Sequence, residues 1–248
     1  GKVLQMALRL GELDRLKIEN MREQNRALQA ERKRSEKEYA MVAVSAGDGI
    51  ESVFRELMVD HVIAGGQTMN PSTDDILKAI KRVKARTVFV FPNNKNIIMA
   101  AEQAQKLADR KVIVLPTRTI PQGMTAMLNF DPEAKPDENA VNMMQAADHV
   151  STGLVTYAAR DSEFDGHDIH AGEYLALLDG ALIGSFSSLD RLIEELSAAA
   201  DALCPSVISV YYGEAVTEAD ANSAAKKLGD HFPDAELSVV NGGQPVYY

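Results

Sequence analysis

The fold of this 248-residue chain is decided by the stretch Gly65-Gly66-Gln67-Thr68-Met69-Asn70-Pro71-Ser72. It stands between the apolar segment 62–64 and the helix-like segment 74–83. Two glycines end a strand, small polar side chains follow, and Thr73 begins a capped helix. This order places hydroxyl, amide and free backbone N–H groups at the C-terminal edge of a sheet, where open α/β sheets bind ligands or partners. The same residues also suit a simple turn followed by a helix cap.

Apolar strands and amphipathic helices alternate around this stretch. The strands are expected at residues 41–45, 61–64, 87–91 and 111–115, and the helices at 50–58, 74–83 and 97–108. Strands that are apolar throughout are typical of a parallel sheet with helices on both faces. Right-handed crossovers would then bring all the polar turns to one edge of the sheet.

Three polar turns follow strands of this sheet, at residues 67–72, 93–96 and 117–123. Convergent amides and hydroxyls without a carboxylate pair suit recognition better than catalysis. The alternative, that they cap helices and tie turns together, is equally compatible with the pattern. We expect no catalytic residue, and the candidate ligand- or partner-binding residues are Gln67, Thr68, Asn70, Ser72, Asn93, Asn94, Asn96, Thr117, Gln122 and Gly123.

The second half of the chain has a different pattern. Alternating segments and an Asp179-Gly180 hairpin turn predict antiparallel strands, and a further strand–helix–strand unit follows at 207–240. We therefore expect an α/β fold with two subdomains: a parallel sheet flanked by helices over 41–135, then a mixed-sheet subdomain over 136–248. Residues 1–40 are interpreted as the tail of an upstream domain plus a linker. The motif Gly65-Gly66-Gln67 recurs as Gly242-Gly243-Gln244. Duplication, the same geometry used twice and chance are the alternative origins of this similarity.

Composition excludes several classes of function. The net charge is −10, and residues 1–40 alone carry +3, so the remainder is strongly acidic, which argues against nucleic-acid binding. No apolar run is long enough to span a membrane, and no secretory leader is expected. Cys204 is the only cysteine, which fits a reducing cytoplasm.

Signatures of chemistry are weak. There is no phosphate-binding or dinucleotide-binding loop. Gly47-Asp48-Gly49 follows a strand and is interpreted as a tight turn with a capping acid, with anion binding at the next helix as the alternative. The segment 165–170 holds two histidines, but at no standard interval for zinc, so no metal is expected.

Several motifs together resemble the C-terminal region of the ATP-binding subunit of bacterial fatty acid kinase, a protein of the dihydroxyacetone-kinase-like (DAK phosphatase-domain) family. The resemblance runs along essentially the whole chain. It rests on residues 17–24, 65–72, 92–97, 121–123 and 242–245 in the expected order.

This resemblance implies a longer parent protein, in which an N-terminal kinase domain, absent here, holds ATP and magnesium. ATP and magnesium are therefore expected in that missing domain, and no cofactor is expected in this chain. The parent is implied to phosphorylate a fatty acid that a separate acyl-binding subunit of the DegV family presents, for use in phospholipid synthesis. The parent is expected to be a homodimer.

The C-terminal region itself is implied to have a DegV-like fold. In DegV proteins a Thr-Ser-Gln-Pro-Ser turn helps to hold the fatty acid carboxylate, and the corresponding turn here is Thr68-Met69-Asn70-Pro71-Ser72. Pro71 and Ser72 match that turn, whereas the residues before them differ.

We therefore expect a non-catalytic, cytoplasmic region of a fatty acid kinase that docks the acyl-binding DegV-family subunit. The alternative is a fatty-acid or small-anion binding module with a pocket at the C-terminal edge of the first sheet.

Overall fold

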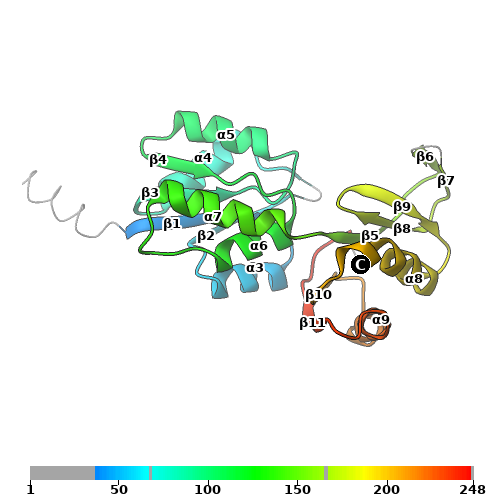
Figure 1. The fold of residues 1–248 in the computed structure, drawn as a ribbon. Helices are drawn as coiled ribbons and strands as arrows, with labels where there is room; N and C mark the ends of the chain where they lie inside the picture. Colours follow the sequence, from blue (N-terminus) through cyan, green and yellow to red (C-terminus); the bar gives the residue numbers. More distant parts are fainter. Residues whose placement is uncertain (1–36, 67–68, 165–166, 247–248) are drawn as a thin grey trace, which may run out of the picture. The chain divides into compact units, whose positions relative to one another are not determined.

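A computed structural model describes residues 37–66, 69–164 and 167–246 (Figure 1). The chain divides into two compact units, residues 1–37 and 38–248, and the structure described below is that of the second unit. The interpretation of residues 1–40 as a domain tail and linker therefore falls almost wholly outside the described residues, as do Gln67 and Thr68 of the first polar turn.

The first subdomain is built on a four-stranded sheet of order β2-β1-β3-β4, in which the β1–β2 and β3–β4 pairs are parallel. This confirms the predicted parallel sheet with flanking helices. Its elements in chain order are β1 (Lys37–Ser45), α3 (Asp48–Glu56), β2 (His61–Ala64), α4 (Thr73–Arg82), β3 (Ala85–Phe91), α5 (Ile98–Leu107), β4 (Lys111–Val114), α6 (Ile120–Leu128) and α7 (Pro136–Asp148).

Helices cover both faces of this sheet (Figure 1). On one face, Val44 and Val90 pack with Ile80 of α4 and with α5. On the other face, Phe54 of α3 and Phe89 are fully buried with residues of α6 and α7. Successive residues of β1 and β3 alternate between the two clusters, which explains why these strands are apolar throughout. Full burial of each large side chain contributes about 1.5–3 kcal/mol.

The second subdomain contains several small sheets. Antiparallel strands form the orders β5-β8-β9 and β6-β7, and β10 pairs with β11 in parallel. Parallel and antiparallel pairs are thus both present, in separate sheets. The elements are β5 (Gly153–Tyr157), β6 (Ser162–Phe164), β7 (His167–Ile169), β8 (Tyr174–Leu178), β9 (Ala181–Phe186), α8 (Leu189–Ala200), the 3-10 turn η1 (Asp201–Leu203), β10 (Val207–Tyr212), α9 (Glu218–His231) and β11 (Glu236–Asn241).

The predicted hairpin between β8 and β9 is confirmed. Asp179 and Gly180 have φ angles of 49° and 86°, so both central residues of the turn are left-handed. A two-residue turn with positive φ at both positions matches the twist of the strands that it joins.

The predicted turn at 117–123 is partly wrong, because α6 begins at Ile120. The Thr119 side chain accepts a hydrogen bond from the backbone N–H of Gln122 and caps this helix, and Pro121 occupies its first turn. Gln122 and Gly123 are therefore helical. The apparent turn signal of Pro121 and Gly123 is compatible with a helix start, since proline is favoured in a first helical turn.

The boundary that was predicted at residue 135 stays a prediction. Met143 and Ala147 of α7 are fully buried in the first subdomain's core, beside residues of α3, β3 and α6. This packing places α7 with the first sheet. Over the part of the chain that the structure describes, no helix has both the length and the apolar character needed to cross a membrane.

Candidate functional site

The polar turns lie at the C-terminal ends of the strands of the first sheet. A hydrogen bond joins two of them, because the Asn94 side chain donates to the carbonyl of Gly66. Gly66 in turn donates to the carbonyl of Met69 at 2.8 Å. The turn after β2 is therefore held against the turn after β3, and we call the edge formed by the turns after β1 to β4 the rim.

Asn93 and Thr117 form a buried link between the ends of three strands. The Asn93 side chain donates to the carbonyl of Val44 at 2.9 Å, and its Oδ1 accepts from the Thr117 hydroxyl at 2.8 Å. The Asn93 backbone N–H donates to Thr117 Oγ1 at 3.1 Å. Asn93 is 7% exposed and Thr117 is fully buried, so both side chains are used within the fold.

Gly123 lies against this link. A Cβ atom at position 123 would stand 2.1 Å from Asn93 Oδ1, a distance at which atoms overlap. The first turn of α6 can thus approach the end of β3 only with glycine at this position. Gly123 is a packing requirement of the rim and offers no side chain to a ligand.

Ser72 caps α4 through a reciprocal pair with Asp75. The Ser72 hydroxyl accepts from the backbone N–H of Asp75, and the Asp75 carboxylate accepts from the Ser72 hydroxyl at 2.6 Å and from its backbone N–H at 3.0 Å. These hydrogen bonds lower the pKa of Asp75, because they stabilise its charged form. Ser72 is exposed, yet its hydroxyl is already hydrogen-bonded to Asp75.

The remaining candidates differ in how available they are. Gln122 Oε1 accepts from the Arg118 backbone N–H at 2.8 Å, and Asn94 Oδ1 accepts from the Asn96 backbone N–H at 2.9 Å. The side chains of Asn70 and Asn96 are exposed and make no hydrogen bond to other described residues. Among the candidates that the structure describes, these two amides are presented to solvent with their side chains unused.

Two cations on the rim were missed among the candidates. Lys95 lies within the turn after β3 and Arg118 within the turn after β4, and both are exposed. Both residues lie just before the start of a helix. This can be recognised in the sequence only when the bounds of α5 and α6 are known.

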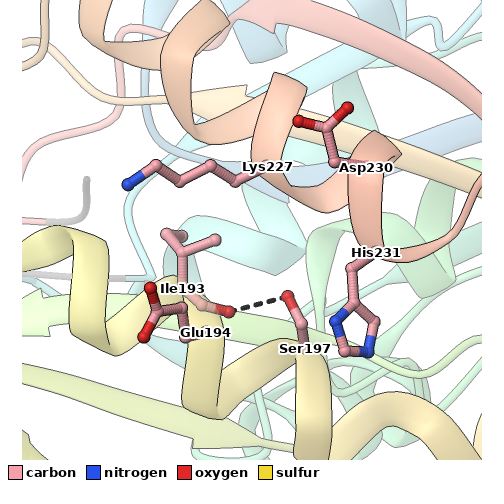
Figure 2. A pocket seen from close by; sticks show the side chains of 6 residues that line it. All are labelled: Ile193, Glu194, Ser197, Lys227, Asp230 and His231. Atoms are coloured by element: carbon pink, nitrogen blue, oxygen red, sulfur yellow. Dashed lines mark hydrogen bonds between the residues drawn. The ribbon is translucent and has the colours of Figure 1, made fainter.

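A cavity lies elsewhere, between α8 and α9 (Figure 2). Its volume is about 330 Å³, and its lining combines one apolar and five polar side chains: Ile193, Glu194, Ser197, Lys227, Asp230 and His231.

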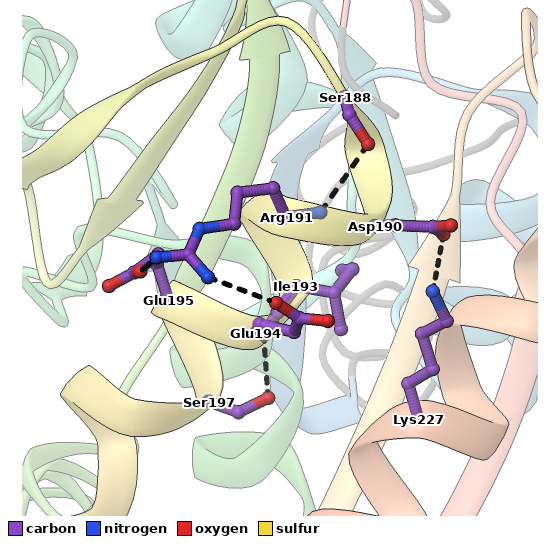
Figure 3. Close-up of polar contacts among 8 residues, drawn as sticks. All are labelled: Ser188, Asp190, Arg191, Ile193, Glu194, Glu195, Ser197 and Lys227. Atoms are coloured by element: carbon purple, nitrogen blue, oxygen red, sulfur yellow. Dashed lines mark hydrogen bonds and ion pairs between the residues drawn. The ribbon is translucent and has the colours of Figure 1, made fainter.

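Figure 3 shows how the polar side chains of this region are paired. Lys227 Nζ reaches Asp190 Oδ1 across the two helices at 2.5 Å, and the Ser197 hydroxyl donates to the carbonyl of Ile193 at 2.7 Å. Arg191 pairs with Glu194 along α8. No motif in the sequence points to this region. Its polar groups are largely satisfied by one another, and no metal-holding group of carboxylates, histidines or cysteines occurs among the described residues.

Comparison with known proteins assigns the chain to a family. The sequence model of the FakA-like C-terminal family, which is named for fatty acid kinase, matches residues 40–248. The chain belongs to this family. Protein YloV of Bacillus subtilis is 39% identical over 259 residues, and an uncharacterized protein of Staphylococcus aureus is 36% identical over 253 residues. The chain is covered completely in both comparisons but spans only 46% of the length of each relative.

Solved structures support the predicted DegV-like fold. The fatty acid kinase B3 protein of Streptococcus pneumoniae, loaded with linoleic acid, matches with a TM-score of 0.55 at 9% identity, over 82% of this chain and 92% of its own. A DegV family protein of Eubacterium eligens, loaded with heptadecanoic acid, matches with a TM-score of 0.57 at 15% identity, over 83% of this chain and 93% of its own. At these identities the likeness concerns the fold alone.

Proposed function

We propose that this chain is the non-catalytic C-terminal region of a fatty acid kinase, and that it docks the acyl-binding DegV-family subunit through the rim. The family match over residues 40–248 carries the proposal. Transfer of phosphate from ATP, with magnesium, is then assigned to a kinase domain elsewhere in the parent, which we propose to be a homodimer. The cytoplasm is the compartment that we propose.

The rim favours docking over a ligand pocket. In open α/β sheets, ligands enter the crevice at the point where the strand order reverses, which here lies between β1 and β3. Asn93 spans this point with its bond to Val44, and the buried Thr117 stands beside it. Asn93 and Thr117 thus fill the position at which a ligand would enter. The exposed amides of Asn70 and Asn96 lie outside it, where a protein surface can reach them.

Docking can be tested by titrating the acyl-binding subunit of the same organism into this chain in a calorimeter. The double variant Asn70→Ala/Asn96→Ala should bind about fivefold more weakly, because two amide contacts are lost at a cost of about 1 kcal/mol. The matched control is Asn222→Ala, which removes an exposed amide from α9. Equal affinity of all three proteins would exclude the exposed amides of the rim as the contact, and absence of binding by the unaltered chain would refute docking itself.

A fatty-acid or small-anion binding module is the second candidate, favoured by the fatty acids bound in both structural neighbours. Native mass spectrometry of the purified chain distinguishes the two. A retained mass in the range of a fatty acid would support the binding module, whereas the unliganded mass together with binding of the acyl-binding subunit would support docking.

A further inference from the structure

Two glycine-containing loops meet at the start of α3. Gly47 and Gly49 lie on one side of this contact, and Gly242 and Gly243, which follow β11, lie on the other. A Cβ atom at position 47 would stand 2.4 Å from the carbonyl oxygen of Gly242 and 2.7 Å from the backbone nitrogen of Gln244. The two backbones therefore touch directly, and we call this contact the glycine junction.

A backbone hydrogen bond crosses the glycine junction. The N–H of Ile50 donates to the carbonyl of Gly242 at 3.0 Å. The N–H of Gly242 instead donates to the carbonyl of Tyr212 at 2.9 Å, within the C-terminal strands. Gly242 thus belongs to the β10–β11 pair through its N–H and to the glycine junction through its carbonyl.

Two buried polar atoms near the glycine junction have no hydrogen-bond partner. Among the residues that the structure describes, Ser45 Oγ and Gln244 Oε1 are the two buried side-chain oxygen or nitrogen atoms that lack one. Ser45 is 3% exposed and Gln244 is 6% exposed. Reversing the Gln244 amide would not correct this, because its Nε2 donates to the carbonyl of Tyr211 at 2.8 Å.

Both atoms lie on the same side of the first sheet as α3. Successive residues of a strand face opposite sides of a sheet, and Val44 packs with α4 and α5, so Ser45 faces the side of α3. Gln244 Oε1 lies over Gly242, because a Cβ atom at position 242 would come within 2.0 Å of it and 3.0 Å from Ile50 Cδ1. The unpaired atoms therefore flank the first turn of α3.

A polar atom that is buried without a partner costs free energy, because it loses its hydrogen bonds to water. Opening the glycine junction would recover this cost for Ser45 and Gln244. We infer that the glycine junction opens and closes in solution while the first sheet and the β10–β11 pair stay folded. The turn after β1 belongs to the rim, so each opening changes the rim, but the inference does not depend on the proposed function.

Hydrogen exchange of the unaltered chain tests the opening. The Ile50 amide should be at least about tenfold less protected than the amides of Gly242 and Leu115, which donate within the C-terminal strands and, at 2.9 Å, to Val90 of the first sheet. Equal protection of Ile50 and Leu115 would overturn the inference, because the junction would then open only on global unfolding. Equal protection of Ile50 and Gly242 would also overturn it, because the C-terminal strands would open together with the junction.

A substitution tests the role of the unpaired hydroxyl. Ser45→Ala removes it, so the closed junction should be favoured and the Ile50 amide should exchange about fivefold more slowly. The matched control is Ser197→Ala, which removes a buried hydroxyl that donates to the carbonyl of Ile193 at 2.7 Å. This control should leave Ile50 exchange within about twofold of the unaltered chain. Unchanged or faster exchange at Ile50 in Ser45→Ala would show that the Ser45 hydroxyl is hydrogen-bonded in the closed junction, and would overturn the inference.

Discussion

At the scale of single residues, the contact between Gly123 and Asn93 sets the geometry of the rim. Gly123→Ala would push a methyl group into Asn93 Oδ1 and break its bond with Thr117. We expect a loss of about 1–3 kcal/mol in the free energy of unfolding, the usual cost of overpacking or of an unpaired buried polar group. Denaturant titration measures this loss.

The Asn93→Gly background supplies the control. Position 93 has a φ of 54°, which glycine adopts readily, and this substitution removes the amide that the new methyl group would strike. Gly123→Ala should therefore cost clearly less in the Asn93→Gly background, as a double-mutant cycle would show. Equal costs in both backgrounds would mean that the methyl group meets some other obstacle.

The sequence predicts where these residues lie but not what they do. Asn93, Thr117 and Gly123 were selected because polar and small residues follow strands, and the structure does place all three on the rim. Residue type cannot show whether an amide is exposed, as at Asn96, or turned inward toward Val44. That choice is made by contacts between segments far apart in the chain.

At the scale of elements, the cap of α4 gives a pH-dependent prediction. Hydrogen bonds from the Ser72 hydroxyl and backbone N–H keep the pKa of Asp75 below its ordinary value. The pair therefore contributes stability above the unfolded-state pKa, and this contribution is lost as the pH falls through the lower folded-state pKa. Ser72→Ala should cost about 1 kcal/mol at neutral pH through loss of the cap.

The cost of Ser72→Ala should shrink at an acid pH below the lowered folded-state pKa of Asp75, because the carboxylate is then protonated in both proteins. Denaturation at both pH values and an NMR titration of Asp75 provide the measurements. Ser188→Ala is the matched control. Ser188 caps α8 in the same way, but the third residue of that helix is Arg191, which has no carboxylate. A pH-independent cost for Ser72→Ala would show that the Asp75 carboxylate does not contribute.

Helix α6 shows why some elements escape sequence analysis. Pro121 and Gly123 are strong turn signals, and the helix is short and weakly patterned. Its stability comes from burying Met124, Ala126 and Met127 against the sheet, which is tertiary packing that local propensity cannot reveal. The alternation of apolar strands and amphipathic helices, by contrast, is repeated along the chain, and the parallel sheet was therefore predicted correctly.

At the scale of the whole described unit, the end of β11 is joined to the start of α3. The backbone N–H of Ile50 donates to the carbonyl of Gly242 at 3.0 Å. Gly242 and Gly243 belong to the second Gly-Gly-Gln motif, and they lie against Gly47 and Gly49 at the start of α3. The prediction of a tight turn at 47–49 is partly wrong, because α3 begins at Asp48, and the contact with the second motif was not predicted because the two segments lie far apart in the chain.

Gly49 tests how far this junction stabilises the unit. Helix propensity alone favours alanine at position 49, but its Cβ would stand 1.8 Å from the carbonyl oxygen of Asn241. Gly49→Ala should therefore lower the free energy of unfolding by about 1–3 kcal/mol and speed hydrogen exchange at the Ile50 amide. Gly229→Ala in α9, where a Cβ meets nothing within 4 Å, should instead gain up to about 1 kcal/mol. If both substitutions stabilise the protein, α3 and β11 can separate without cost, and the junction does not hold the first sheet to the C-terminal strands.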